Sequence, residues 1–331
     1  MQPRKSAVPA RERGAALLTV LLLVAVIAVL AGTALERLRL STRLAGNAAA
    51  GAQARGYAEA AEALAVTRIS NLLGKDNTRV TLAGGWSGAP FGLPLPGGGT
   101  AIARVTDGGN CFNLNGLVSE SAPGVYTTYP TARVEFARLM RLIQIPAGSA
   151  DRIAASTADW IDTDQNQQPS GAEDGTYIAK PTPYRTAGTL MADPSELRAI
   201  DGVTPDIYAT LRPYVCTKPK AELSRINVNT LQPEKAALVA MLYPDTMSVA
   251  QAQTMLVRRP PDGYPSVAIF LNGASGIVPD TGGDGQLSVT SGWFALTIDV
   301  NLNGTQLREH ALIDATRLPA RLVSRQWGEQ T

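Results

Sequence analysis

The residues of this sequence best placed to do chemistry are five carboxylates gathered between positions 159 and 174. No lysine or arginine occurs from position 153 to position 179, so charge repulsion opposes bringing these carboxylates together unless a cation binds them. Oxygen ligands without histidine or cysteine favour calcium over zinc. The predicted ligands are Asp159, Asp162, Asp164, Asn166, Glu173 and Asp174.

The spacing of four of these residues supports calcium. Asp162, Asp164, Asn166 and Glu173 occupy positions 1, 3, 5 and 12 of an EF-hand-like pattern. Gln167 stands where an EF-hand has glycine, so we expect a different turn and an ion that stabilises the fold rather than one that catalyses. A solvated acidic loop without a metal is the alternative. Asp193 and Glu196 give a weaker signal of a second site.

Catalytic residues are hard to find elsewhere in the sequence. The single histidine, His310, lies in a predicted late strand and no nucleophile motif accompanies it. The acidic cluster lacks a neighbouring base, which favours a closed structural site over a catalytic one. The sequence therefore predicts a protein that is not an enzyme.

The two cysteines, Cys111 and Cys216, are the only ones in the chain. In an oxidising compartment an even pair readily forms a disulfide. We predict that these two are joined, and two separate buried thiols are the alternative.

The N-terminus predicts a membrane segment. Residues 1–14 are basic, and residues 15–35 form an uncharged run of 21 residues rich in Leu, Val and Ala. As a helix this run spans roughly 31 Å, about the thickness of the hydrocarbon core of a bilayer. A cleaved signal peptide is the alternative, but this run is longer than a typical signal and continues into helix-compatible sequence up to residue 74. The positive-inside rule then places the bulk of the chain in the periplasm, on a single-pass anchor.

The remaining elements indicate an α+β fold. Residues 100–106 and three runs near the end, 287–291, 293–301 and 307–315, have strand patterns, and Asn303-Gly304 is a hairpin signal between the last two. The segments between them are helical in pattern. We expect a helix-on-sheet domain interrupted by a helical insertion with helices at 131–145, 150–160, 194–200, 205–211, 232–242, 248–258 and 266–271.

Nucleic acid is not an expected partner. Residues 222–275 resemble helix-hairpin-helix and sterile-alpha-motif-like (SAM-like) modules, some of which bind DNA. The segment between the two helices, residues 243–248, lacks the glycine whose backbone would approach a phosphate. Four basic residues balance four acidic ones in this module, and the whole chain has a net charge of only +2.

The junction around Gly14 and Ala15 resembles the cleavage site of type IV prepilins. The resemblance implies that a prepilin peptidase cuts after Gly14 and leaves an N-methylated Ala15. Most members of that family carry glutamate at the fifth mature position, which is Thr19 here. In the family that glutamate pairs with the amine of a neighbouring subunit, so its absence fits a subunit at a filament tip.

Over nearly its whole length the chain resembles the K class of type II secretion minor pseudopilins. The motifs that carry the resemblance are the modified cleavage site and residues 112–117, 158–166, 171–174, 183–185, 195–197 and 226–230. The resemblance implies a pseudopilin fold with an inserted helical domain stabilised by calcium. It also implies an inner-membrane location, a tip complex with the I and J class minor pseudopilins, and contacts with the major pseudopilin, the assembly platform and the prepilin peptidase.

The predicted organisation follows from this resemblance and from the patterns above. It comprises a leader (1–14), a transmembrane segment (15–35), the pseudopilin helix and first strands (36–117), an inserted helical domain (118–285) and C-terminal strands (286–331). The insertion contains the calcium loop (159–174) and the SAM-like unit (222–275). The alternatives are a minor pilin of a type IV pilus or DNA-uptake filament, and a membrane-anchored periplasmic hydrolase.

Overall fold

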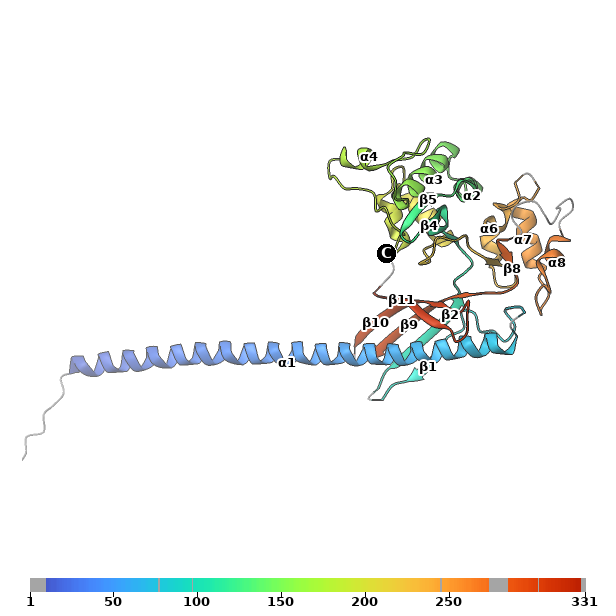
Figure 1. The fold of residues 1–331 in the computed structure, drawn as a ribbon. Helices are drawn as coiled ribbons and strands as arrows, with labels where there is room; N and C mark the ends of the chain where they lie inside the picture. The colour runs from blue at the N-terminus through green and yellow to red at the C-terminus, as the bar shows by residue number, and fades with distance from the viewer. Residues whose placement is uncertain are drawn as a thin grey trace, which may run out of the picture.

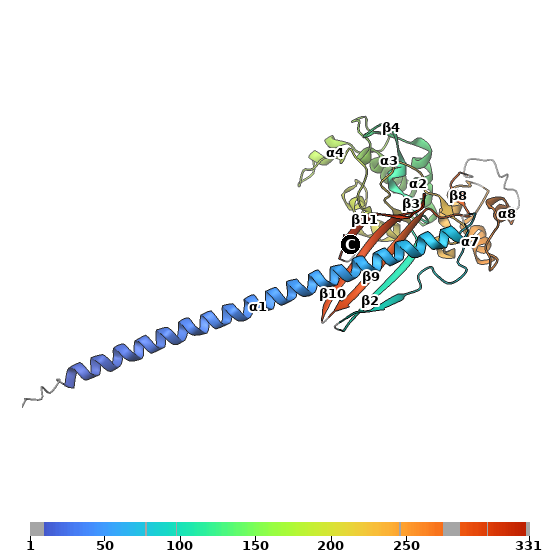
Figure 2. The ribbon, with the colours of Figure 1, turned by 60° about the horizontal axis from the view of Figure 1, so that its bottom comes forward.

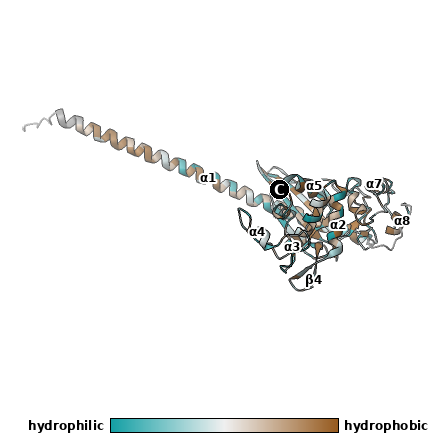
Figure 3. Ribbon diagram, turned by 90° about the horizontal axis from the view of Figure 1, so that it is seen from above, coloured by the Kyte–Doolittle hydropathy of each residue, from teal (hydrophilic) through white to brown (hydrophobic). Residues whose placement is uncertain are grey.

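A single long helix dominates the shape of the molecule. The computed structural model of the chain describes residues 10–76, 78–96, 98–244, 246–273, 285–302 and 304–328. Helix α1 (Ala10–Lys75) contains 66 residues and no proline, so it runs unbroken for roughly 100 Å. Its N-terminal half projects away from the rest of the chain (Figure 1) and is mostly hydrophobic (Figure 3).

The C-terminal part of α1 lies across a five-stranded antiparallel sheet (Figure 2). The strand order is β1 (Phe91–Pro94), β2 (Thr100–Asp107), β9 (Trp293–Leu302), β10 (Thr305–Asp314) and β11 (Arg321–Trp327). Strand β9 alternates between buried and half-buried side chains, as a strand with one covered face should. Alanines at one-turn spacing on α1 are buried against this face and let the helix approach closely: Ala54, Ala58, Ala61 and Ala65.

Between β2 and β9 the chain forms a unit of helices, which lies on the other side of the sheet from α1 (Figure 1). We call residues 108–292 the helical unit. Its α-helices are α2 (Pro130–Leu142), α3 (Ala147–Ile161), α4 (Asp174–Ile178), α5 (Pro205–Leu211), α6 (Ala237–Ala240), α7 (Val249–Val257) and α8 (Val267–Leu271). Its 3₁₀ helices are η1 (Leu114–Leu117), η2 (Pro194–Ala199), η3 (Arg212–Tyr214) and η4 (Pro233–Lys235).

Three small strand pairs complete the helical unit. Strands β3 (Phe112–Asn113) and β6 (Val215–Cys216) are parallel, as are β7 (Ile226–Asn227) and β8 (Leu287–Ser288). Strands β4 (Val118–Ala122) and β5 (Val125–Thr128) form an antiparallel hairpin.

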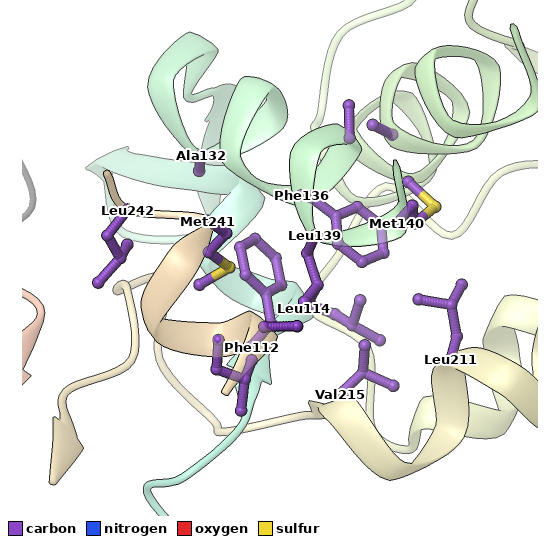
Figure 4. Packing of buried hydrophobic residues seen from close by; sticks show 14 of the residues in the cluster. Phe112, Leu114, Ala132, Phe136, Leu139, Met140, Leu211, Val215, Met241 and Leu242 are labelled. Carbon is purple, nitrogen blue, oxygen red and sulfur yellow. The ribbon is translucent and has the colours of Figure 1, made fainter. Parts of the chain in front are cut away.

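The helical unit has its own hydrophobic core. Phe112 stacks on Phe136 of α2 with ring centroids 4.8 Å apart, and both rings are fully buried. Figure 4 shows these rings surrounded by Leu114, Leu139 and Met241. A separate cluster of buried residues lies between α1 and the sheet. Each part of the molecule therefore buries its own apolar side chains. This explains how a bulky helical unit can lie beside a small sheet.

The structure confirms the predicted α+β class, with a long N-terminal helix, an antiparallel sheet and an additional helical region. The hairpin between β9 and β10 also forms at the predicted place, although Asn303 lies outside the described residues. So do residues 1–9 of the predicted leader, 274–284 of the predicted insertion and 329–331. The domain boundaries and the SAM-like character of residues 222–275 stay predictions.

Some elements differ from the sequence-based expectation. The predicted helix at 194–200 is the 3₁₀ helix η2 rather than an α-helix, and residues 232–242 contain η4 and the short helix α6. Strands β1 and β11 and the β4–β5 hairpin were not predicted. Strand β1 lies in a segment rich in glycine and proline, and β11 carries mostly exposed side chains, so neither shows a clear apolar alternation.

Candidate metal site and the contacts that hold it

The acidic loop connects the end of α3 to the start of α4. Carboxylate oxygens of Asp162, Asp164 and Glu173 lie within 4.8 Å of one another. Asp162 and Glu173 are buried, whereas Asp164 is half-buried. One oxygen of Asp162 and both oxygens of Glu173 have no hydrogen-bond partner in the described part of the chain. Buried carboxylate oxygens without a partner are costly, so these three side chains have the donor set and the unmet demand that a hard cation satisfies.

Burial and mutual repulsion raise the affinity of this cluster for protons. Burial raises the pKa of Asp162 to about 7, with Asp164 and Asp159 adding to the effect. Burial raises the pKa of Glu173 to about 8, again with repulsion from the neighbouring aspartates. Near neutral pH the cluster therefore either retains protons or needs a cation, and a calcium ion would supply two positive charges to offset this repulsion.

The other three predicted ligands lie outside this group, and the carboxylates of two of them have partners of their own. Asp159 accepts hydrogen bonds from the backbone N–H groups of Gln168 at 3.2 Å and Ala172 at 2.8 Å. Asp174 accepts from the backbone and hydroxyl of Thr186 at 2.9 and 3.0 Å. Asn166 is exposed, and its backbone N–H donates to Asp164 at 2.7 Å. The structure therefore brings three of the six predicted ligands together, and the other three shape the loop.

Glycine at position 171 allows the loop to close. A Cβ atom there would lie 2.0 Å from Oδ2 of Asp159, a distance that no side chain tolerates. We expect Gly171→Ala to lower the free energy of unfolding by about 1–3 kcal/mol, because the loop must open around the added methyl group. Gly175→Ala is the matched control, since a Cβ at Gly175 meets nothing within 4 Å. Urea denaturation of both variants checks this, and equal midpoints would contradict it.

The β4–β5 hairpin contacts the acidic loop, which the sequence did not predict. The hydroxyl of Thr128 donates to Oδ2 of Asp162 at 2.7 Å. The backbone N–H of Thr163 donates to the carbonyl of Tyr126 at 3.0 Å, and the Thr163 hydroxyl donates to the same carbonyl. The hairpin and the loop are therefore held as one body on the end of α3.

An aromatic cluster flanks the acidic loop, with one ring on α3 and another on α4. Trp160 packs edge-on against Tyr177 with ring centroids 5.4 Å apart, and its indole N–H donates to Glu196 at 3.3 Å. Glu196 also accepts from the backbone of Asp193, while Asp193 accepts from Ser195, so the two acids form a capping box on η2. These contacts give Asp193 and Glu196 a structural role that needs no metal.

Cys111 and Cys216 form a disulfide, with Cα atoms 5.8 Å apart and a sequence separation of 105 residues. The bond joins the residue just before β3 to the last residue of β6, and these two short strands are parallel.

Two asparagines in the sequence motifs use their side-chain amides to form hydrogen bonds with backbone groups, as a peptide group would. The amide of Asn115 donates to the carbonyls of Met191 and Lys218 and accepts from the backbone of Met191, at 2.8–2.9 Å. The amide of Asn227 donates to the carbonyl of Val80 and to Ser291. Both asparagines are buried, and each satisfies backbone groups from segments far apart in the sequence.

The N-terminal helix is long and apolar enough to cross a membrane, and it is the one such helix in the described residues. Its large apolar side chains from Leu17 to Leu30 are 49–70% exposed, so no part of the described chain covers them. Gly14 and Ala15 lie within α1. The hydroxyl of Thr19 donates to the carbonyl of Ala16 at 2.9 Å, which satisfies it within the helix.

Comparisons with known proteins give a consistent result. Two family models described as type II secretion system (T2SS), protein K match residues 110–220 and 226–290. The type II secretion system protein K of Pectobacterium carotovorum subsp. carotovorum is 33% identical over 333 residues, covering 96% of this chain and 97% of that protein. The protein of the same name from Klebsiella pneumoniae is 32% identical, with the same coverage of both chains.

A solved structure has the same fold. A chain in the crystal structure of the GspK-GspI-GspJ complex from the type 2 secretion system of enterotoxigenic Escherichia coli matches with a TM-score of 0.71 and 31% sequence identity. The match covers 84% of this chain and 96% of that chain. The shared fold therefore includes both the sheet with its helix and the helical unit.

Proposed function

This chain belongs to the type II secretion system protein K family, and we propose that it is the minor pseudopilin that forms the tip of a pseudopilus together with the I and J class minor pseudopilins. In this role it starts or caps the filament that exports folded periplasmic proteins across the outer membrane. Its task is assembly and not catalysis.

The observation that carries this proposal is the match to a chain solved within a complex of three pseudopilins. The match extends over 96% of that chain at a TM-score of 0.71, so nearly all of the fold of that chain has a counterpart here. A match confined to the sheet and α1 would support only a generic pilin-like fold, but the helical unit is included.

The first half of α1 supports a location in the inner membrane before assembly. Its apolar side chains have no partner within the described chain, so they need either lipid or the helices of neighbouring subunits. We propose that a prepilin peptidase cleaves after Gly14, that Ala15 becomes the methylated N-terminus, and that the bulk of the chain lies in the periplasm. The major pseudopilin and the inner-membrane assembly platform are then its partners during filament growth.

Two features support a place at the tip. Thr19 carries no charge and its hydroxyl is bonded to its own helix, so it offers no carboxylate to the N-terminal amine of another subunit. The helical unit adds bulk beyond the sheet at the end of the molecule away from the membrane segment (Figure 1). A subunit of this shape leaves little room for another one above it.

We propose that calcium binds Asp162, Asp164 and Glu173 as a structural ion. Support comes from the three converging carboxylates and from the buried oxygens of Asp162 and Glu173 that lack partners in the described chain. Bound there, the ion would hold the acidic loop and, through Thr128 and Asp162, the β4–β5 hairpin.

Co-purification tests the tip-complex proposal. Residues 15–49 contain no buried side chain, so a chain that begins at residue 40 keeps the helix packing that starts at Ala54. We expect this soluble form to elute as one complex with I and J class partners in size-exclusion chromatography, and to lose them when a chelator is added. The soluble part of the major pseudopilin, in place of the I and J proteins, is the control. A chain that remains monomeric with both partners present would rule the proposal out.

A further inference from the structure

A polar cleft of about 420 Å³ lies between the sheet and the helical unit. Its sheet side includes Thr297, His310 and Gln326, on β9, β10 and β11. Its other side comes from the helical unit and includes Arg212 and Lys235. The function proposed above does not use this cleft.

The acidic groups that line the cleft already have partners. Asp107 accepts hydrogen bonds from Thr230, Ser291 and the backbone of Gly109, and it interacts electrostatically with the buried Lys218. Asp193 accepts from the backbone of Ser195 at 2.8 Å and from the amide of Gln326 at 3.1 Å, and the Arg212 guanidinium attracts it. Each of these carboxylates is therefore matched with one cation.

Lys235 is the one cation named here that has no carboxylate partner among these pairs. It is half-buried, and no acidic side chain in the described ranges forms a salt bridge with its ammonium group. Burial lowers the pKa of Lys235, and repulsion from the nearby Arg212 lowers it further. Asp193 already offsets the charge of Arg212, so the ammonium group of Lys235 is the charge that a bound anion would balance.

The sheet side of the cleft offers hydrogen-bond donors rather than further charge. The hydroxyl of Thr297 lies 3.4 Å from Nδ1 of His310. The amide nitrogen of Gln326 donates one N–H to Asp193 and carries a second. These neutral donors suit the oxygens of a carboxylate that Lys235 attracts. A volume of about 420 Å³ falls in the range of sites that hold ligands of several heavy atoms, which exceeds the needs of a bare inorganic ion.

We propose that this cleft binds an acidic peptide segment, with a glutamate or aspartate carboxylate held by Lys235 and oriented by the donors on β9, β10 and β11. The carboxylate supplies the negative charge that Lys235 lacks. The site lies where the helical unit meets the sheet, so a bound segment contacts both parts of the molecule.

The histidine content of the chain gives this proposal a direct test. His310 is the only histidine in the sequence, so its imidazole resonances report on the cleft without assignment. The full chain, purified in dodecyl maltoside micelles with a tag free of histidine, is titrated with the fluorescein-labelled peptide Glu-Asp-Glu-Glu. Gln-Asn-Gln-Gln and inorganic phosphate are titrated in parallel. We expect the acidic peptide alone to shift the His310 resonances and to bind more weakly as salt rises.

Substitutions at Lys235 locate the binding. We expect Lys235→Met to weaken the acidic peptide about tenfold and Lys235→Arg to restore most of the affinity. Lys75→Met is the matched control, because Lys75 is exposed at the end of α1 and does not line the cleft. Equal binding of the two peptides, an effect of phosphate alone, or unchanged affinity in Lys235→Met with a normal melting temperature would each overturn the proposal.

Discussion

Calcium added at a hundredfold excess over its dissociation constant should raise the melting temperature of the chelator-treated chain by about 5–10 °C. The reason is linkage: a ligand that binds only the folded state at this excess stabilises it by about 2.7 kcal/mol. Each kcal/mol corresponds to about 2–4 °C for a domain of this size. The measurement is thermal unfolding of the soluble form, followed by circular dichroism, with and without calcium.

Two variants assign this stabilisation to the acidic loop. Glu173→Gln and Asp162→Asn should each remove most of the calcium-dependent shift, because each removes a carboxylate from the group of three. Asp206→Asn, a change to an exposed acid on α5, should leave the shift intact. If the two loop variants respond to calcium as fully as Asp206→Asn does, the ion binds elsewhere.

The pH dependence of the calcium-free chain follows from the same carboxylates. Asp162 and Glu173 have pKa values of about 7 and about 8 in the folded chain, above the ordinary range of about 4 for unfolded carboxylates. The folded state therefore binds protons more tightly than the unfolded state, and stability falls as the pH rises from about 4 through 8. Calcium competes with these protons, so the shift in melting temperature should be larger at pH 8 than at pH 6. The opposite order would contradict this account.

Loss of the disulfide should have the second large effect. The bond between Cys111 and Cys216 joins residues separated by 105 positions. In the chain-entropy model such a loop contributes up to about 4–5 kcal/mol, so Cys111→Ser/Cys216→Ser should melt about 10 °C or more below the parent chain. Reductant should lower the melting temperature of the parent chain by a similar amount and leave the double variant unchanged. A parent chain indifferent to reductant would show that the bond does not constrain the unfolded state.

Much of the fold is visible in the sequence because its signals are local. The length of the apolar run predicts the first half of α1, and the alternation of residues 293–301 predicts β9. Strand β11 shows no such alternation, since it lies at the sheet edge with most of its side chains exposed. Its position depends on pairing with β10 and on contacts between Arg325 and acids of α1, which are more than 250 residues away.

The candidate site shows the same limit at the level of single residues. Spacing identified the acidic loop, but it could not separate the carboxylates that converge from those that hold the loop. Asp159 and Glu173 are both buried acids. Asp159 is bonded to backbone amides of the loop, whereas the oxygens of Glu173 have no partner in the described residues. This difference depends on how the backbone turns at Gly171, and Thr128 reaches the loop from a hairpin 34 residues earlier.

The way the helical unit joins the sheet has a mechanical consequence. The chain leaves the sheet at Asp107 and returns at Trp293, and Asp107 is paired with Phe294 on the neighbouring strand. Both connections to the helical unit lie at the same end of β2 and β9. A pull on the helical unit along these strands therefore slides β2 past β1 and β9 past β10. The hydrogen bonds between antiparallel strands lie across this direction, so the ladder of β9 and β10 is loaded in shear and many bonds share the force. For a subunit at the end of a growing filament, an attachment of this kind resists a pull on the helical unit without peeling the sheet apart.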